Sequence, residues 1–125
     1  MSDRKNRDVF ERHINRIIRL IEECILGEIR PNPHGFISIK VDNVVGEWVV
    51  TFYNANYYKP ILKKAGFIYE NFGWSGAIDN LMFIKHEVLK NILTSAEKKD
   101  LQKLLEFVKK FYNEYSAMTK QFDIK

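Results

Sequence analysis

The chain has 125 residues and a formal net charge of +4, with 46% hydrophobic and 29% charged residues. This length predicts one domain, because two domains would each be too small to bury a useful core, and the composition is too apolar for general disorder. The mild positive charge permits binding to a polyanion without requiring it. No apolar run approaches the roughly 18 residues of a membrane span, so we expect no membrane association.

The single cysteine, Cys24, excludes an intramolecular disulfide and any zinc site built from several cysteines. The first eight residues lack the apolar segment that a signal peptide needs. We therefore expect a cytoplasmic protein. Lys, Ile and Asn are frequent and Ala is scarce, which is typical of an AT-rich genome. This bias fits a phage or another mobile element, in which case the expected location is the host cytoplasm.

The first predicted element is a long amphipathic helix over residues 3–27. Its apolar residues recur at the spacing i, i+3, i+4, i+7, and Gly27 is well placed to end it. The next segment, residues 28–35, contains two prolines and a glycine, so we expect a loop there.

An antiparallel hairpin is predicted next. Residues 36–41 alternate between apolar and polar, residues 47–53 are β-branched and aromatic, and turn residues separate the two runs. A short helix is expected over residues 57–65 and a third strand over residues 67–70. The glycine-bracketed residues 72–76 are expected to form a loop or a tight turn.

A further helix is predicted over residues 81–93, although residues 81–84 could equally form a strand. The last helix is expected at about residues 95–118, introduced by a capping box at residues 94–97. The order is then α-β-β-α-β-α-α. The sequence therefore predicts an α+β fold in which a small antiparallel sheet of about three strands packs against long N- and C-terminal helices.

The arginines are concentrated at one end of the chain, since all six lie within the first 30 residues. Four basic side chains of the first helix project at nearly one angle, opposite the apolar stripe: Lys5, Arg12, Arg16 and Arg19. Guanidinium groups match phosphate oxygens, so this basic ridge could lie along a nucleic-acid backbone. Nearby carboxylates also permit the simpler interpretation of a solvated charged face.

Aromatic and basic residues are mixed between residues 52 and 74. Bases stack on aromatic rings, at ~1–3 kcal/mol per base, while lysines bind phosphates. The same rings are typical of protein interfaces. About half of them are expected to fill the core, whereas Tyr57, Tyr58 and Trp74 flank predicted turns and are expected to be exposed. The candidate binding residues of this segment are Tyr57, Tyr58, Lys63, Lys64 and Trp74.

The last predicted helix has an unusually wide apolar face. Phe107 and Met118 broaden the apolar arc to roughly 160°, beyond the ~100° that one core contact requires. Either the helix is deeply buried, or these two residues form a second apolar surface for a partner or a second copy of the chain. A homodimer is therefore one of the assemblies that the sequence allows.

Motifs of known enzymes are incomplete in this sequence. His86 and Glu87 match the first half of the zinc motif HExxH, but position 90 is lysine. No Walker loop and no dinucleotide-binding glycine pattern occurs, and the three histidines have no metal-ligand spacing. We therefore expect no metal and no cofactor, and favour a non-enzymatic protein, with an enzyme of unrecognised type as an alternative.

Two functional hypotheses follow. The first is a nucleic-acid-binding or regulatory protein that uses both the basic ridge and the aromatic–basic segment, which requires the two to share one face of the molecule. The second is a protein-binding inhibitor, encoded by a phage or mobile element, that acts on a host nucleic-acid enzyme in an anti-defence, anti-CRISPR-like or immunity-type role.

Overall fold

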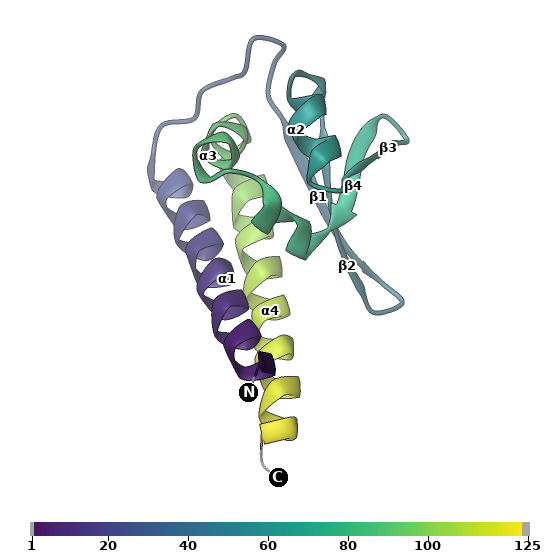
Figure 1. Cartoon of the computed structure of the whole chain (residues 1–125). Helices are drawn as coiled ribbons and strands as arrows, with labels where there is room; N and C mark the ends of the chain where they lie inside the picture. The colour runs from purple at the N-terminus through teal and green to yellow at the C-terminus, as the bar shows by residue number, and fades with distance from the viewer. Residues whose placement is uncertain (1, 124–125) are drawn as a thin grey trace.

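A computed structural model describes the backbone of residues 2–123 and the side chains of residues 8–117. The fold is α+β, as predicted, with a four-stranded antiparallel sheet and long helices at both ends of the chain (Figure 1). In chain order the elements are α1 (Ser2–Leu26), β1 (Ser38–Val44), β2 (Glu47–Tyr53), the 3₁₀ turn η1 (Asn56–Tyr58), α2 (Lys59–Lys64), β3 (Ile68–Glu70), β4 (Gly73–Ala77), the 3₁₀ segment η2 (Ile78–Phe83), α3 (His86–Thr94) and α4 (Lys98–Asp123).

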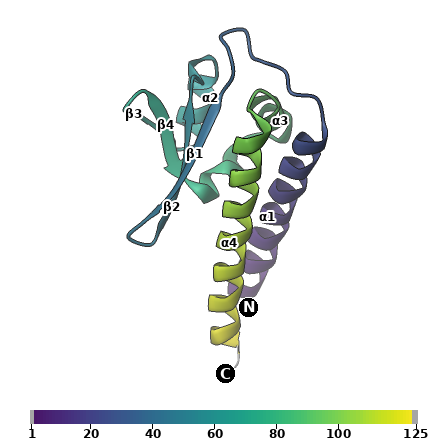
Figure 2. The ribbon, with the colours of Figure 1, turned by 180° about the vertical axis from the view of Figure 1, so that it is seen from behind.

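The two long helices, α1 and α4, lie side by side and run in opposite directions (Figures 1 and 2). The apolar stripe of α1, which includes Ile14, Ile17 and Ile21, is buried against α4 and α3. The predicted amphipathic periodicity is thus the packing surface of this helix. Within residues 2–123, no helix has an apolar stretch long enough to cross a membrane.

The sheet has the strand order β1-β2-β4-β3, one strand more than the sequence predicted. The loop or tight turn expected over residues 72–76 is wrong for all but Phe72, because strand β4 begins at Gly73 and places Trp74 opposite Phe52. Its two glycines hid the strand from pattern analysis. Both glycines lie in close contacts, because a Cβ atom at Gly76 would lie 2.7 Å from the ring of Phe67 and one at Gly73 would lie 2.8 Å from the ring of Tyr53.

Two other predicted elements differ in extent. The short helix expected over residues 57–65 is split into η1 and α2. Residues 81–84, left open between strand and helix, lie mostly within the 3₁₀ segment η2, and a regular helix begins only at His86. Short 3₁₀ segments are common connectors and carry no periodicity of their own.

The capping box predicted at the start of the last helix is also wrong. The Thr94 hydroxyl donates a hydrogen bond back to the Lys90 carbonyl oxygen at 2.9 Å, so it belongs to the end of α3. The chain then turns before α4 begins at Lys98. Two backbone amides hold this turn against the sheet, because the Ile37 N–H donates to the Ser95 carbonyl at 3.0 Å and the Ile39 N–H to an Asp100 carboxylate oxygen at 3.1 Å.

The wide apolar face of α4 is explained in part by burial. The Phe107 ring is buried against Trp48 of β2, with ring centroids 4.9 Å apart. Of the two alternatives, Phe107 therefore fits a deeply buried helix and not a second apolar surface, since the sheet covers that side chain. Met118, its predicted companion, lies outside the described side chains.

Both hairpins of the sheet end in two-residue tips with positive φ angles, as in type I′ turns. The preferred pair for such a tip is Asn-Gly. Each tip has one of these residues and one apolar residue: Val45 precedes Gly46, and Phe72 follows Asn71. Val45 is 96% exposed and Phe72 is 85% exposed, so neither apolar side chain gains much from packing.

We predict that Gly76→Ala lowers the free energy of unfolding by about 1–3 kcal/mol, because the new methyl group overlaps the Phe67 ring in a packed core. Urea denaturation of the two proteins measures this change. The double variant Gly76→Ala/Phe67→Leu should recover part of the loss, since the smaller side chain frees the space. Equal stability of wild type and Gly76→Ala would show that β4 does not pack against Phe67 in this way.

The thiol of Cys24 provides a second check on the helical core. Burial raises the pKa of this thiol, only partly offset by the charge of Lys90, and Glu23 raises it further. Since the thiolate is the reactive form, we expect Cys24 to react with a thiol reagent about a hundredfold more slowly in the native protein than in denaturant at mildly alkaline pH. Similar rates in the two conditions would place Cys24 outside the core.

Candidate ligand-binding groove

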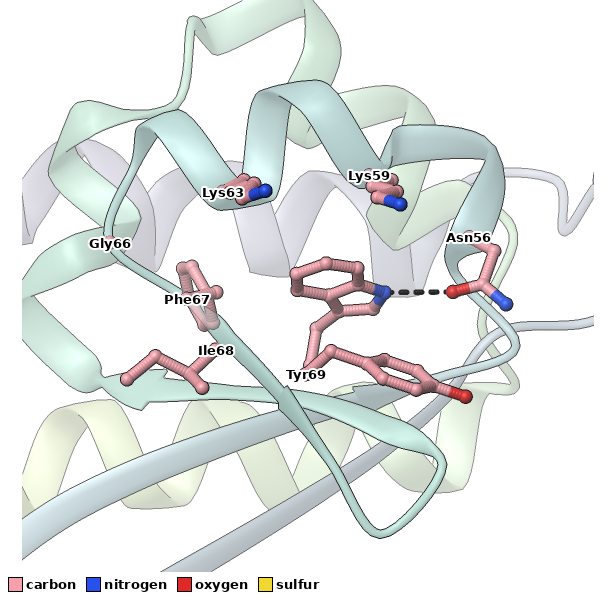
Figure 3. A pocket seen from close by; sticks show the side chains of 8 residues that line it. Asn56, Lys59, Lys63, Gly66, Phe67, Ile68 and Tyr69 are labelled. Atoms are coloured by element: carbon pink, nitrogen blue, oxygen red, sulfur yellow. Dashed lines mark hydrogen bonds between the residues drawn. The ribbon is translucent and has the colours of Figure 1, made fainter.

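A groove of about 750 Å³ lies between helix α2 and the β3–β4 hairpin (Figure 3). Its volume is in the range of small-ligand sites in proteins. The groove is lined by Asn56, Lys59, Lys63, Gly66, Phe67, Ile68, Tyr69 and Trp74.

The floor of the groove is the indole ring of Trp74. The side chain is only 4% exposed, and its Nε1–H donates a hydrogen bond of 2.9 Å to the Oδ1 atom of Asn56. Because an indole N–H can only donate, it fixes the orientation of the Asn56 amide. The Nδ2 group of Asn56 is directed away from the indole ring, as Figure 3 shows.

Tyr69 forms an exposed aromatic wall beside this floor. It pairs with Trp74 across the β3–β4 hairpin, and the two rings lie with centroids 5.1 Å apart at an angle of 51°. Tyr69 is 46% exposed, so part of its ring is free to contact a ligand. The neighbouring Ile68 is also exposed and adds apolar surface to the groove.

The charged side chains that line the groove are two lysines, and no carboxylate is among the lining residues. Lys59 and Lys63 are one helical turn apart on α2, and Figure 3 shows both beside the groove. The nearest acidic residue in the sequence, Glu70, follows Tyr69 in strand β3. Glu70 is not among the residues that line the groove and instead borders two other hollows, one beside Trp48 and one beside Thr51. The groove therefore favours an anionic ligand.

The exposure predicted for two aromatic residues is wrong. Trp74 is buried because it lies on a strand that faces α2 and not on a loop, and Tyr58 is only 8% exposed. Desolvation, followed by the influence of Tyr57, raises the pKa of the Tyr58 hydroxyl. Tyr57 is exposed as predicted, and its ring lies 6.0 Å from that of His34.

The basic ridge of α1 lies away from this groove. Arg12, Arg16 and Arg19 are exposed, and among the described side chains they form no ion pair. Their helical spacing places them on the side of α1 opposite its buried stripe. In Figures 1 and 2, helix α4 lies between α1 and the sheet. The ridge and the aromatic–basic segment thus do not share one face. Lys5 lies outside the described side chains.

Sequence reasoning found some of the groove and missed the rest. Lys63 and Trp74 were candidates and line it, whereas Lys64, the third basic residue of α2, does not. Asn56, Ile68 and Tyr69 were missed. No local pattern marks Asn56 or Ile68, and Tyr69 belongs to the aromatic–basic segment but was not selected from it. Lys59 could have been selected from its spacing of four residues from Lys63, which places both on one face of a helix.

Among the described side chains, no group of three or more His, Cys, Asp and Glu residues is arranged to hold a metal ion. Comparison with known proteins gave no match to a family model, a curated protein or a solved structure. The chemistry of the groove is therefore the basis on which a function is argued.

Proposed function

We propose that this protein binds single-stranded nucleic acid in the groove between α2 and the β3–β4 hairpin. The observation that carries this proposal is the combination, in one groove, of two lysines, an exposed tyrosine ring and no carboxylate side chain. Lysines attract the phosphates, and the exposed face of Tyr69 offers a surface on which a base stacks.

A single strand fits this groove better than a duplex. A base can reach the Tyr69 ring only when it is not stacked between two neighbouring bases, and a duplex holds its bases in that stacked state. The groove is also too small for a double helix but large enough for a nucleotide. Inorganic phosphate alone would leave the aromatic surface unused.

The basic ridge of α1 is a weaker candidate for the same role. Over residues 8–26, its three arginines are accompanied by four carboxylates, at Asp8, Glu11, Glu22 and Glu23. Carboxylates beside the arginines repel a phosphate backbone and reduce the net attraction. The α2 segment, in contrast, has no acidic residue between Glu47 and Glu70.

We predict that Lys63→Ala weakens binding of a short single-stranded oligonucleotide by about tenfold at low salt, because one phosphate contact is lost. The slope of log affinity against log salt should also become shallower by about 0.7. Fluorescence anisotropy over a salt series measures both quantities. Tyr69→Ala should lose about 1–3 kcal/mol of binding free energy through the lost stack.

The matched control is Lys64→Ala, which removes the same charge from the same helix without touching the groove. It should change the affinity much less than Lys63→Ala does. Arg16→Ala serves as a second control on the far helix. If Lys63→Ala, Lys64→Ala and Arg16→Ala all weaken binding equally, the attraction is a general charge effect and the groove is not the site.

A second candidate function, a protein-binding inhibitor, is favoured by the tip of the β3–β4 hairpin. Phe72 adopts a φ angle of 67°, in the left-handed region, and remains 85% exposed. A non-glycine residue in this conformation costs about 1–2 kcal/mol. Because Phe72 is exposed, packing within the protein does not offset the strain of its backbone. This favours a role for the Phe72 ring in contacting another protein.

We predict that Phe72→Gly raises the free energy of unfolding by about 0.5–1 kcal/mol, because glycine adopts a positive φ without steric strain. Urea denaturation measures this gain. If the Phe72 ring is an anchor for a host protein, Phe72→Gly should no longer retain that protein in a pull-down from nuclease-treated lysate. The control Val45→Asn, at the tip of the other hairpin, should still retain it. Retention by Phe72→Gly would remove this second candidate.

A further inference from the structure

The groove leads at one end to an exposed tyrosine that does not line it. Figure 3 shows Asn56 and Lys59 toward one end of the groove and Gly66 at the other. Asn56 begins the 3₁₀ turn η1, and side chains three residues apart in such a turn lie on the same side, which accounts for the shared position of Asn56 and Lys59. Of the two residues between them, Tyr58 is buried and Tyr57 is 59% exposed on a third side of the turn. The Tyr57 ring therefore stands just beyond this end of the groove.

A second ring lies beside that of Tyr57. It belongs to His34, in the loop between α1 and β1, and the two ring centroids are 6.0 Å apart at an angle of 45°. Both residues are exposed. Aromatic side chains, histidine included, are the surfaces on which unpaired bases stack. We call Tyr57 and His34 the ring platform.

Hydrogen bonds hold the loop that carries His34 in place. The Nδ2 group of Asn54 donates to the carbonyl oxygens of His34, at 3.1 Å, and of Phe36, at 2.9 Å. The His34 N–H donates to the Oδ1 atom of Asn32 at 2.7 Å. Gly35 allows the close approach, since a Cβ atom there would lie 3.0 Å from Nδ2 of Asn54. A loop that is ordered before its ligand arrives loses less entropy on binding.

The charges around the ring platform favour the same anionic ligand as the groove does. Residues 29–41, which include the His34 loop, and residues 48–69, which include η1 and α2, contain no Asp or Glu. Two carboxylates, those of Glu97 and Asp100, border a separate hollow beside Phe36. A polyanion is therefore attracted along the path from the groove to the ring platform.

We infer that the ring platform is a second base-binding subsite, so that the ligand is a strand of several nucleotides and not a mononucleotide. This inference rests on the proposed function and extends the same site. One base stacks on Tyr69 in the groove, and a base farther along the same strand stacks on Tyr57. Lys59, which lines the groove at the end next to η1, contacts a phosphate between these two bases.

The test compares a ligand that fills only the groove with one that also reaches the ring platform. Thymidine 5′-monophosphate is the short ligand and a thymidine hexanucleotide is the long one, so both present the same base. Titrations of the full chain followed by NMR at low salt give both affinities. Tyr57→Ala should weaken binding of the hexanucleotide about tenfold and leave binding of the monophosphate unchanged. Tyr69→Ala should weaken binding of both.

Two further variants serve as controls. Tyr57→Phe retains the ring and should bind the hexanucleotide as the wild type does, since stacking requires the ring and not the hydroxyl group. Phe83→Ala removes a ring that is 70% exposed but does not line the groove, and should change neither affinity. Circular dichroism and thermal unfolding confirm that each variant is folded.

The outcomes separate the second subsite from the groove itself. If Tyr57→Ala binds the hexanucleotide as tightly as the wild type does, while Lys63→Ala and Tyr69→Ala weaken it, the second subsite is wrong and the groove remains the binding site. Equal weakening of both ligands by Tyr57→Ala also contradicts the inference, because the effect of Tyr57 would then lie within the groove. If neither ligand binds at low salt, the proposed function fails and the second subsite fails with it.

Discussion

The position of Trp74 is the constraint on which the candidate site depends. A buried indole N–H without a partner costs about 1–3 kcal/mol, and Asn56 provides the partner at 2.9 Å. This bond ties the 3₁₀ turn η1 to strand β4. Helix α2 follows directly from η1, so the same bond helps to set where Lys59 and Lys63 stand relative to the β3–β4 hairpin. One polar contact thus organises both the floor and the charged side of the groove.

Much of the fold could be predicted from the sequence because it depends on local periodicity. The stripe of α1, the apolar face of α4, the alternation in β1 and the β-branched and aromatic run of β2 are each visible within one segment. Strand β4 is different, because Gly73 and Gly76 erase its alternation. The reason for glycine at Gly76 is a side chain from elsewhere, the ring of Phe67, and no local pattern reports such a contact.

The candidate site was predictable in composition but not in geometry. The segment rich in lysine and aromatic residues does contain the groove. The burial of its side chains depends on the pairing of β4 with β2, which the sequence did not predict. Trp74 was expected to be exposed but is buried and forms the floor of the groove. Asn56 begins the turn η1, and its side-chain oxygen accepts from Trp74 of a distant strand. A residue's role was therefore set by its tertiary partner and not by its neighbours in sequence.

The pairing of α1 with α4 has a consequence for how the chain reaches this state during synthesis. Ile14, Ile17 and Ile21 leave the ribosome early, but the helix that covers them begins only at Lys98. Until α4 emerges, this apolar stripe lacks its main partner, and such surfaces are where nascent chains associate wrongly or recruit chaperones. Premature termination within α4 should thus yield an aggregation-prone product, even though the whole sheet has already been translated.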